Sequence, residues 1–394
     1  MPTIPSPDWA LITSALDDDL YKASMQAAVI RLYDEIDARY AFFNRGKTKF
    51  PPGFASALQS QIDRLKFLAL TVNEIEWLRT CPSLSWLPRA YIDFLIGFRY
   101  SYDKLFLRQS DDGELEIEIE GPWYRVIRWE VPLMALISEL YFRMTGQKAD
   151  VDLFVVRLQK KARLFEAEGC NVTDFGTRRR HSYNIHDNAV RYLVEHCKTF
   201  MGTSNLHFAH KYRTRPIGTH AHEWFMFHAA MHGVTSANRT GCEAWMKMYG
   251  GRLGIVLPDT FTTDVFLRDF NLLMARQFDG VRHNSGDPVP WGYKMIRHYE
   301  SLGIDPTTKL VIFSDALDAA KAVALQREFA GKIRIAFGIG TNLTNDVGVK
   351  PLNMVIKATA FRIHGTWVPV SKLSDDTGKA TGEVAELYRQ VLRI

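Results

Sequence analysis

The sequence predicts an α/β protein that carries an additional α+β domain. From about residue 123 onward, short apolar strands alternate with helical stretches. The first third instead combines helical periodicity with a strictly alternating strand over 115–120. A length of 394 residues, 46% of them hydrophobic, suits two unequal domains. We expect an α+β domain over 1–122, to which roughly 358–394 return, and an α/β barrel-like domain over 123–357.

Periodicity places the elements of the first domain. Apolar residues at spacings of three and four predict a helix over 20–33, and the acidic run 17–19 in front of it is a helix-start signal. The same periodicity predicts helices over 54–70 and 72–79, whereas 39–43 is expected to be a strand.

Several apolar strands of the second domain run into polar residues. They are expected over 253–257, 278–281, 310–313 and 333–337. Because the loops after parallel strands converge on one face of a sheet, we expect these polar endings to form one site. A helix over 319–329 would cover the outside, and a late hairpin of 359–363 and 366–371 is expected to return to the first domain.

Composition argues against several classes of protein. The net charge of +5 is small for this length and does not by itself indicate a nucleic-acid partner. No apolar run reaches the roughly 18 residues that span a membrane, and the N-terminal residues lack the features of a signal peptide. The cysteines are far apart and are expected to be free thiols in a reducing compartment. We therefore expect a soluble cytoplasmic protein with no membrane and no nucleic-acid partner.

The segment Gly338-Ile339-Gly340-Thr341 follows a predicted strand. Its two glycines can turn bare backbone amides toward a phosphate, with a hydroxyl alongside. The alternative is an ordinary tight turn between a strand and a helix. Neither the Rossmann fingerprint nor the Walker pattern is matched, which argues against both nucleotide-binding folds.

Short polar side chains end two other strands. Asn284, Asp287 and Asp315 are suited to bind sugar hydroxyls or a hydrated Mg²⁺ beside phosphates. Arg282, in the same loop as Asn284, could stabilise an anion. A simpler interpretation makes Asp315 a helix cap and Asp287 part of a turn.

Phe175 stands close to the arginine run 178–180. An aromatic side chain beside several guanidinium groups can stack a flat ring while the cations neutralise acidic groups. The alternatives are a solvated basic run or, with Lys160, Lys161 and Arg163 nearby, a nucleic-acid patch.

Half of the histidines fall in one short segment of the chain. The pairs His220/His222 and His228/His232 have the spacing of metal ligands, but no cysteine lies at ligand spacing and no fourth ligand can be nominated. We therefore assign no metal-ligating residues. A second interpretation makes one imidazole a nucleophile that Glu223 orients, and a third places the histidines in packed or surface positions.

Six segments taken together resemble the nicotinate phosphoribosyltransferase family. They match in order from about residue 17 to residue 375. The segments are 19–22 (Asp-Leu-Tyr-Lys), 174–179 (Asp-Phe-Gly-Thr-Arg-Arg), 202–205 (Gly-Thr-Ser-Asn), 218–224 (Gly-Thr-His-Ala-His-Glu-Trp), 282–288 (Arg-His-Asn-Ser-Gly-Asp-Pro) and 337–341 (Phe-Gly-Ile-Gly-Thr). The resemblance implies an irregular α/β barrel of the type II phosphoribosyltransferase kind with an additional α+β domain. It also implies a homodimer with the active site at the subunit boundary.

The reaction that the resemblance implies joins nicotinate to 5-phosphoribosyl 1-pyrophosphate and gives nicotinate mononucleotide and pyrophosphate. Mg²⁺ takes part, and ATP is hydrolysed as a co-substrate. The reaction belongs to NAD biosynthesis by salvage. Departure of pyrophosphate leaves an oxocarbenium-like ribose, so such a site must bind anions on one side and place a flat aromatic nucleophile on the other.

The resemblance also implies roles for single residues. Phe175 and Tyr21, the latter from a partner subunit, would sandwich the pyridine ring. Arg178 and Arg282 would meet the nicotinate carboxylate or neighbouring phosphates. Asp315 would hold the ribose hydroxyls.

Two further motifs acquire roles in the same way. Gly338, Gly340 and Thr341 would cradle the 5′-phosphate. In this family the histidine of the Ala-His-Glu-Trp block is phosphorylated by ATP, and the matching residue here is His222, with Glu223 beside it.

Two positions bear on substrate choice and on turnover. The related nicotinamide phosphoribosyltransferase tends to carry an acid where Ser204 stands, and a neutral hydroxyl tolerates the carboxylate of nicotinate, so nicotinate is favoured. The family usually has Asp where Asn284 stands, and losing that charge should weaken any metal or ribose contact made there. This asparagine is the hint of an alternative function, a sensor of nicotinate or phosphoribosyl compounds without turnover.

Overall fold

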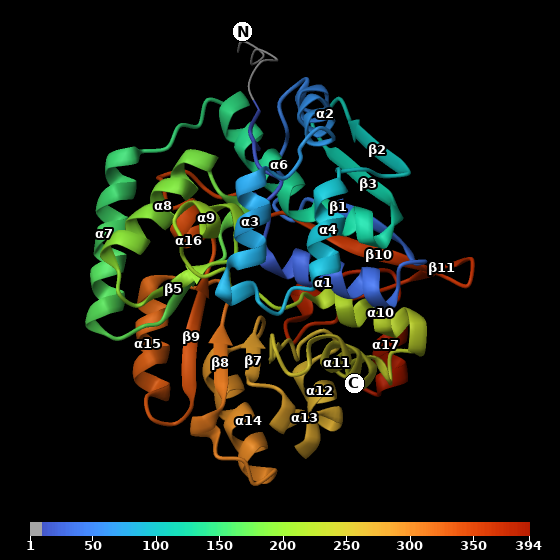
Figure 1. The fold of residues 1–394 in the computed structure, drawn as a ribbon, viewed down its shortest axis with the longest axis vertical. Helices are drawn as coiled ribbons and strands as arrows, with labels where there is room; N and C mark the ends of the chain where they lie inside the picture. Colours follow the sequence, from blue (N-terminus) through green and yellow to red (C-terminus); the bar gives the residue numbers. More distant parts are fainter. Residues whose placement is uncertain (1–9) are drawn as a thin grey trace.

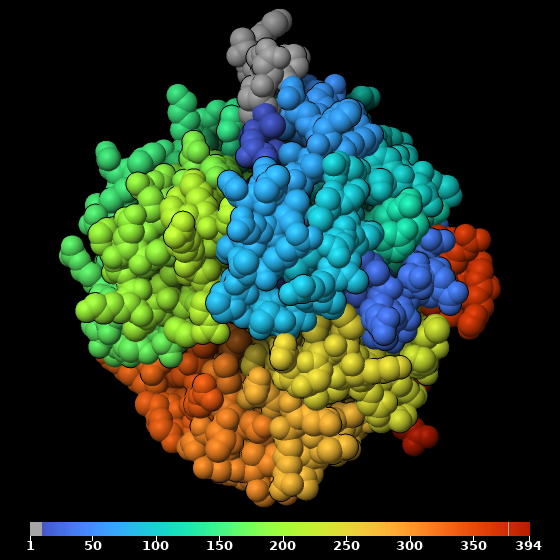
Figure 2. Space-filling model, viewed as in Figure 1, coloured from blue at the N-terminus to red at the C-terminus, as the bar shows by residue number. Residues whose placement is uncertain are grey.

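The computed structural model describes residues 10–394 and contains two sheets, around which the helices pack (Figure 1). One sheet has five antiparallel strands, and the other has six parallel strands. The α/β fold with an additional α+β part is therefore confirmed. Figure 2 shows the N-terminal third, in blue and cyan, lying directly on the green and yellow segments that follow it in the chain.

The antiparallel sheet joins the two ends of the chain. Its strands, in spatial order, are β11 (Thr366–Pro369), β10 (Val355–Ile363), β1 (Asp37–Phe43), β3 (Leu115–Pro122) and β2 (Lys104–Gln109). Burial alternates along β3, as the sequence predicted. The hairpin of β10 and β11 is confirmed, and β10 pairs with β1. The exact domain boundaries stay a prediction.

Three helices of the first third begin where the sequence predicted them: α1 (Leu20–Leu32), α2 (Phe54–Leu65) and α3 (Val72–Thr80). The helices α4 (Arg89–Gly97), α5 (Trp123–Val126) and α6 (Glu130–Met144) were not predicted. Helix α2 is shorter than the predicted 54–70, because Thr71 and Glu74 form a capping box that starts α3 and leaves the preceding residues as a turn.

The acidic run before α1 does not act as the predicted helix-start signal. Asp19 occupies the N-cap position, yet its side chain makes no capping hydrogen bond. Asp17 and Asp18 are buried and bind Arg180 and Arg128, respectively. The carboxylates therefore fasten this segment to distant parts of the chain instead of capping the helix.

The parallel sheet carries the predicted strand endings. Its strands, in spatial order, are β5 (Phe200–Thr203), β4 (Val172–Asp174), β9 (Arg334–Ile339), β8 (Leu310–Phe313), β7 (Gly280–His283) and β6 (Ile255–Val256). Strands β4 and β5 were not predicted, because so few residues show no periodicity. Within the described residues β5 and β6 are the edges and do not pair with one another, so the sheet is irregular rather than a closed ring.

The remaining helices pack around the parallel strands or lie beside the antiparallel sheet (Figure 1). They are α7 (Val151–Ala167), α8 (Tyr183–His196), α9 (Leu206–Lys211), α10 (His222–His232), α11 (Ala237–Tyr249), α12 (Thr263–Asp269), α13 (Leu272–Gln277), α14 (Pro288–Ser301), α15 (Ala319–Phe329), α16 (Thr341–Thr344) and α17 (Ala385–Leu392). Helix α15 has the predicted bounds. Over residues 10–394, no helix has the length and apolar character needed to cross a membrane.

Candidate active site

A cavity of about 600 Å³ lies at the carboxyl ends of four parallel strands. Phe175 follows β4, Asn284 follows β7, Ser314 follows β8 and Gly340 follows β9, and all of these residues line the cavity. This is the edge where loops of a parallel sheet converge. The prediction that the polar strand endings share one site is confirmed for these loops.

The ring of Phe175 is held in place by a glycine. A Cβ added to Gly338 would lie 2.3 Å from the Cδ2 atom of Phe175. The Phe175 amide donates to the Ile339 carbonyl at 2.8 Å, which fixes the backbone beside β9. Gly338 itself does not line the cavity, so its role here is to make room for the aromatic ring, while Gly340 and Thr341 form the wall.

Four arginines line the same cavity: Arg157, Arg178, Arg179 and Arg282. Burial lowers the pKa of Arg282 to about 10, and burial together with neighbouring Arg178 lowers the pKa of Arg179 to about 10. Within the described chain the Nε atom of Arg282 has no hydrogen-bond partner. Crowded and desolvated guanidinium groups of this kind favour the binding of an anion.

Acidic side chains in the cavity wall do not cancel this charge. Asp346 accepts from Arg157 at 2.5 Å and from Lys161 at 2.6 Å, so it is already neutralised. Asp318 is the other carboxylate in the wall, and it caps α15 by accepting from the Lys321 amide. The cavity therefore has an excess of positive charge.

His222 begins α10 and lies beside the cavity. Its Nδ1 atom is 3.1 Å from the Thr260 hydroxyl, and its Nε2 atom is 2.8 Å from the amide oxygen of Asn284, which lines the cavity. The Lys372 ammonium lies 3.0 Å from the same Nε2 atom. Burial and the nearby Lys372 charge hold the pKa of His222 well below its usual range, so the imidazole is neutral. A neutral ring nitrogen next to a cation suits nucleophilic attack on a phosphoryl group.

Asp259 completes the surroundings of His222. Its Oδ2 atom accepts from Lys372 at 3.1 Å and from Ser285 at 2.6 Å, and its Oδ1 atom lies 3.7 Å from His222 Nε2. The Lys372 charge and the Ser285 hydrogen bond outweigh burial and keep the pKa of Asp259 below its usual range. The carboxylate thus stays charged and holds Lys372 against the imidazole.

The family of the chain follows from sequence comparison. A model of the nicotinate phosphoribosyltransferase (NAPRTase) family matches residues 170–393, and a model of the NAPRTase N-terminal domain matches residues 16–138. The chain belongs to the nicotinate phosphoribosyltransferase family. The predicted resemblance is confirmed.

Individual relatives cover nearly the whole chain. The nicotinate phosphoribosyltransferase of Chromohalobacter salexigens is 48% identical over 390 residues, which are 98% of this chain and 99% of the relative. The nicotinate phosphoribosyltransferase of Desulforapulum autotrophicum is 47% identical over 384 residues, 96% of this chain and 97% of that one. The crystal structure of nicotinate phosphoribosyltransferase from Porphyromonas gingivalis has a TM-score of 0.94 at 40% identity and covers 97% of this chain and 100% of its own.

Within one chain of this member of the nicotinate phosphoribosyltransferase family, Tyr21 contacts Arg178. The ring of Tyr21 lies 5.8 Å from the guanidinium of Arg178 in the same chain, and its hydroxyl donates to Glu130 at 3.2 Å. This contact lies within one chain, and the expectation that Tyr21 of a partner subunit sandwiches the pyridine ring stays a prediction. Tyr21 stands behind Arg178 and does not line the cavity.

Ser204 does not line the cavity either. It is buried, and its hydroxyl donates to Asp19 at 2.8 Å. Burial raises the pKa of Asp19, and Arg178 acts in the opposite direction. Ser204 therefore holds a carboxylate behind Arg178, and the expected contact of Ser204 with the substrate is not present in this structure.

Asp315 lies at the rim rather than in the wall. Its neighbours Ser314 and Ala316 line the cavity, whereas Asp315 accepts from the Lys379 ammonium at 2.6 Å. Lys379 belongs to the segment after β11. A ribose whose hydroxyls bind the Asp315 carboxylate would have to share it with Lys379 or displace the Lys379 ammonium.

Glu223 does not orient the histidine ring, which corrects the prediction. Its carboxylate points to Lys22, with Nζ 2.7 Å from Oε2, because consecutive residues on α10 face different directions. Burial raises the pKa of Glu223 to about 7. Thr260 and Asp259 occupy the surroundings of His222 instead.

His220 and His228 are buried, whereas His232 is exposed. Both ring nitrogens of His220 lack hydrogen-bond partners in the described residues, and the ring lies against Phe225 and Trp245. His228 and His232 stack on one another at 5.6 Å. In residues 10–394, no group of three His, Cys, Asp or Glu side chains is arranged to hold a metal ion.

The sequence assigned no role to three residues around the site: Lys22, Asp259 and Lys372. Asp259 does stand where the strand over 253–257 was expected to end, and Lys22 belongs to the segment 19–22 of the family resemblance. Lys372 is 150 residues away from His222, and no local pattern marks it.

Proposed function

We propose that this chain is a nicotinate phosphoribosyltransferase that forms nicotinate mononucleotide and pyrophosphate from nicotinate and 5-phosphoribosyl 1-pyrophosphate, in NAD biosynthesis by salvage. The names of relatives 48% and 47% identical over nearly the full chain support this. The observation that carries it is the shared cavity, in which Phe175 faces a group of arginines.

Nicotinate would stack on Phe175, with its carboxylate bound by Arg178 or Arg282. The excess of positive charge in this cavity supports an acid over the neutral nicotinamide, because a neutral amide gains less than a carboxylate from neighbouring guanidinium groups. Stacking presents the ring nitrogen to the sugar, and the nitrogen forms a bond to the anomeric carbon as the bond from that carbon to pyrophosphate breaks.

The phosphoribosyl donor would occupy the rest of the cavity. Gly340 and Thr341 would hold the 5′-phosphate, and Arg282 and Arg179 the pyrophosphate. Asp315, at the rim, would bind the ribose hydroxyls. The arginines stabilise the negative charge that grows on the leaving group.

The wall residues fit Mg²⁺ that arrives together with the pyrophosphate. Asp318 forms no salt bridge in the described part of the chain, and Mg²⁺ is commonly bound by one or two carboxylates plus substrate phosphates. Asp315 and Asn284 are the further oxygen donors nearby. When bound, the ion would neutralise charge on the leaving pyrophosphate.

ATP would serve as co-substrate by phosphorylating His222. The neutral imidazole would take the γ-phosphoryl group, ADP would leave, and Lys372 would balance the new charge at 3.0 Å from Nε2. Asn284 touches both the ring and the cavity, so it offers a route by which phosphorylation changes the donor pocket. Hydrolysis of the phosphohistidine would return the enzyme to its starting state.

A cytoplasmic homodimer is the expected form of the enzyme. Sedimentation of the purified chain tests the dimer. In such a dimer Tyr21 of the partner subunit would complete the stack on the pyridine ring.

The test is formation of nicotinate mononucleotide from labelled nicotinate, with and without ATP, using nicotinamide as the competing substrate. We expect product from nicotinate, stimulation by ATP, and a kcat/KM for nicotinamide lower by about a hundredfold or more. Absence of product from nicotinate would leave the sensor hypothesis, and a preference for nicotinamide would make the chain a nicotinamide phosphoribosyltransferase. For the histidine, γ-labelled ATP should label the wild type and leave His222→Ala unlabelled.

A further inference from the structure

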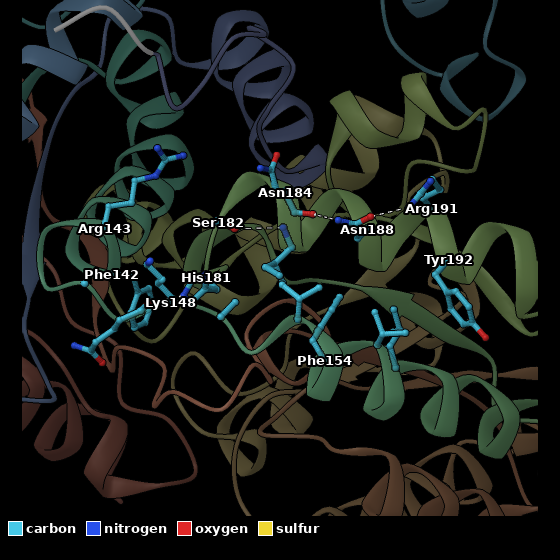
Figure 3. Close-up of a pocket in the computed structure, with 17 residues that line it drawn as sticks. Phe142, Arg143, Lys148, Phe154, His181, Ser182, Asn184, Asn188, Arg191 and Tyr192 are labelled. Atoms are coloured by element: carbon cyan, nitrogen blue, oxygen red, sulfur yellow. Dashed lines mark hydrogen bonds between the residues drawn. The ribbon is translucent and has the colours of Figure 1, made fainter. Parts of the chain in front are cut away.

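A second cavity of about 760 Å³ lies outside the active site, between the end of α6, α7 and α8 (Figure 3). It shares no lining residue with the active-site cavity. Its inner wall is apolar and consists of Phe142, Phe154, Leu158 and Ile185, all of them buried. Cavities that bind small molecules commonly have about 300–1,000 Å³ and a mostly apolar lining.

The outer part of this cavity is basic. Arg143, Lys148 and Arg191 line it, and none of the lining residues is Asp or Glu. In the described chain Lys148 is exposed and forms no salt bridge, and Arg191 donates to Asn188. Figure 3 shows Arg143 and Arg191 on either side of Asn184 and Asn188, with Phe154 across the cavity from them. An acidic group would be attracted to this edge.

Helix α7 leaves valines open to solvent at the same place. Val151 is 55% exposed and Val155 is 40% exposed, and both line the cavity. An apolar molecule that covers these exposed side chains and the apolar wall of the cavity would remove apolar surface from water, which favours its binding.

The two cavities are separated by protein. The His181 ring belongs to the wall of the second cavity, where it stacks on Phe142 at 4.6 Å and donates from Nε2 to the Gln147 carbonyl at 3.0 Å. Its amide donates to the Thr344 carbonyl at 3.0 Å, so residues on the active-site side close this wall. A molecule in the second cavity would therefore not compete directly with nicotinate.

We propose that this second cavity binds a small amphipathic acid, a molecule with an aromatic or aliphatic body and one carboxylate, sulfonate or phosphate group. The body lies on Phe154 and Leu158 and covers Val155. The acid group meets one of the two cations at the edge, Lys148 at one end of the cavity or Arg191 at the other. The proposal does not rest on the reaction assigned to the active site.

The first test uses 8-anilinonaphthalene-1-sulfonate, a fluorescent aromatic anion, as the probe. Val155→Trp fills the cavity from an exposed position, and Val156→Trp is the matched control, because Val156 is the next residue of α7, is 63% exposed and does not line the cavity. We expect Val155→Trp to raise the Kd of the probe by about tenfold or more and Val156→Trp to leave it within about twofold. Thermal melting and nicotinate turnover of both variants should stay at the wild-type level.

The second test separates charge from apolar contact. Lys148→Glu/Arg191→Glu should raise the Kd of the sulfonate probe by about tenfold, while the neutral probe N-phenyl-1-naphthylamine stays within about twofold. The control is Lys247→Glu/Arg89→Glu, the same change of charge at exposed positions outside the cavity.

Any of three results would overturn the proposal. The first is equal binding of the sulfonate probe by wild type and Val155→Trp. The second is displacement of the probe by saturating nicotinate, which would place it in the active site. The third is a change of sedimentation in Val155→Trp without a change in probe binding, which would make this face a contact between copies of the chain.

Discussion

Lys22 and Glu223 form a buried ion pair, with Nζ and Oε2 2.7 Å apart. The same ammonium lies 2.6 Å from Glu130, and Glu130 accepts from Arg178 at 3.1 Å. Glu223 is the residue after His222 on α10. One lysine therefore connects the segment that presents the histidine to the arginine that lines the cavity.

Removing this lysine should destabilise the protein strongly. In Lys22→Met two buried carboxylates lose their common partner, and breaking a buried pair costs about 3–5 kcal/mol. We expect the free energy of unfolding in urea to fall by about that amount. The control is Lys294→Met, whose partner Asp264 is exposed, and a surface pair contributes about 0–1 kcal/mol. Equal free energies of unfolding of the two variants would show that the buried ion pair contributes no more to stability than the surface pair.

Acid should destabilise the fold through its packed histidines. Burial lowers the pKa of His220 from 6.5 to about 3, so below pH 6.5 the unfolded chain binds a proton that the folded chain does not. Stability from this group is present above pH 6.5 and is lost as the pH falls. Between about pH 7.5 and about pH 5.5 the loss is about 1.4 kcal/mol for one such histidine.

The variant His220→Leu checks this pH dependence. Its unfolding free energy should fall less over the same range, by about 1.4 kcal/mol, than that of the wild type. His364→Gln, at an exposed position, should follow the wild type. If His220→Leu loses as much stability in acid as the wild type, His220 is not the group that titrates.

Gly338→Ala should weaken nicotinate binding. The added Cβ would lie 2.3 Å from Phe175 Cδ2, so the ring must move away from the position that lines the cavity. Displacement of a positioning group by about 1 Å can cost about a hundredfold in rate. We expect kcat/KM for nicotinate to fall by about tenfold to a hundredfold, whereas Gly97→Ala, with open space around the added atom, should behave like the wild type. A Gly338→Ala enzyme with normal kcat/KM would mean that Phe175 does not stack on the substrate.

Asn284→Asp should keep or raise turnover. The amide oxygen of Asn284 is 2.8 Å from His222 and 3.5 Å from the Lys372 ammonium. A carboxylate at this position would therefore lie next to a positive charge. The new charge also restores the residue that the family usually carries. Asn284→Ala, which removes the contact with His222, should lower the stimulation by ATP. A collapse of turnover in Asn284→Asp would show that the neutral amide is required here.

The sequence predicted the residues that line the active site better than the residues that hold them in position. Phe175, Arg282 and Gly340 could be placed because residues after parallel strands gather on one edge, whatever the details of the sheet. The partners of His222 could not, since Lys372 reaches it from a segment after β11, and long-range pairs of this kind leave no periodic signal. Glu223 was misassigned because adjacency in sequence on a helix places side chains on different faces.

The difference between lining residues and supporting residues also applies to Tyr21 and Ser204. Both belong to motifs that the family resemblance singled out, yet both are buried and contact groups behind Arg178 instead of lining the cavity. A motif marks residues that the site needs, and the three-dimensional contacts decide whether they support the site or meet the substrate.

The rate of nicotinate mononucleotide formation by Arg282→Gln tests the central claim most directly. Burial lowers the pKa of Arg282, and its Nε atom has no partner within the described chain, so an anion in the cavity would gain a hydrogen-bond donor there. We expect kcat/KM for nicotinate to fall by about a hundredfold or more while the melting temperature stays equal or rises. Turnover within about twofold of the wild type would contradict the assignment of this cavity as the site where nicotinate and the phosphoribosyl donor react.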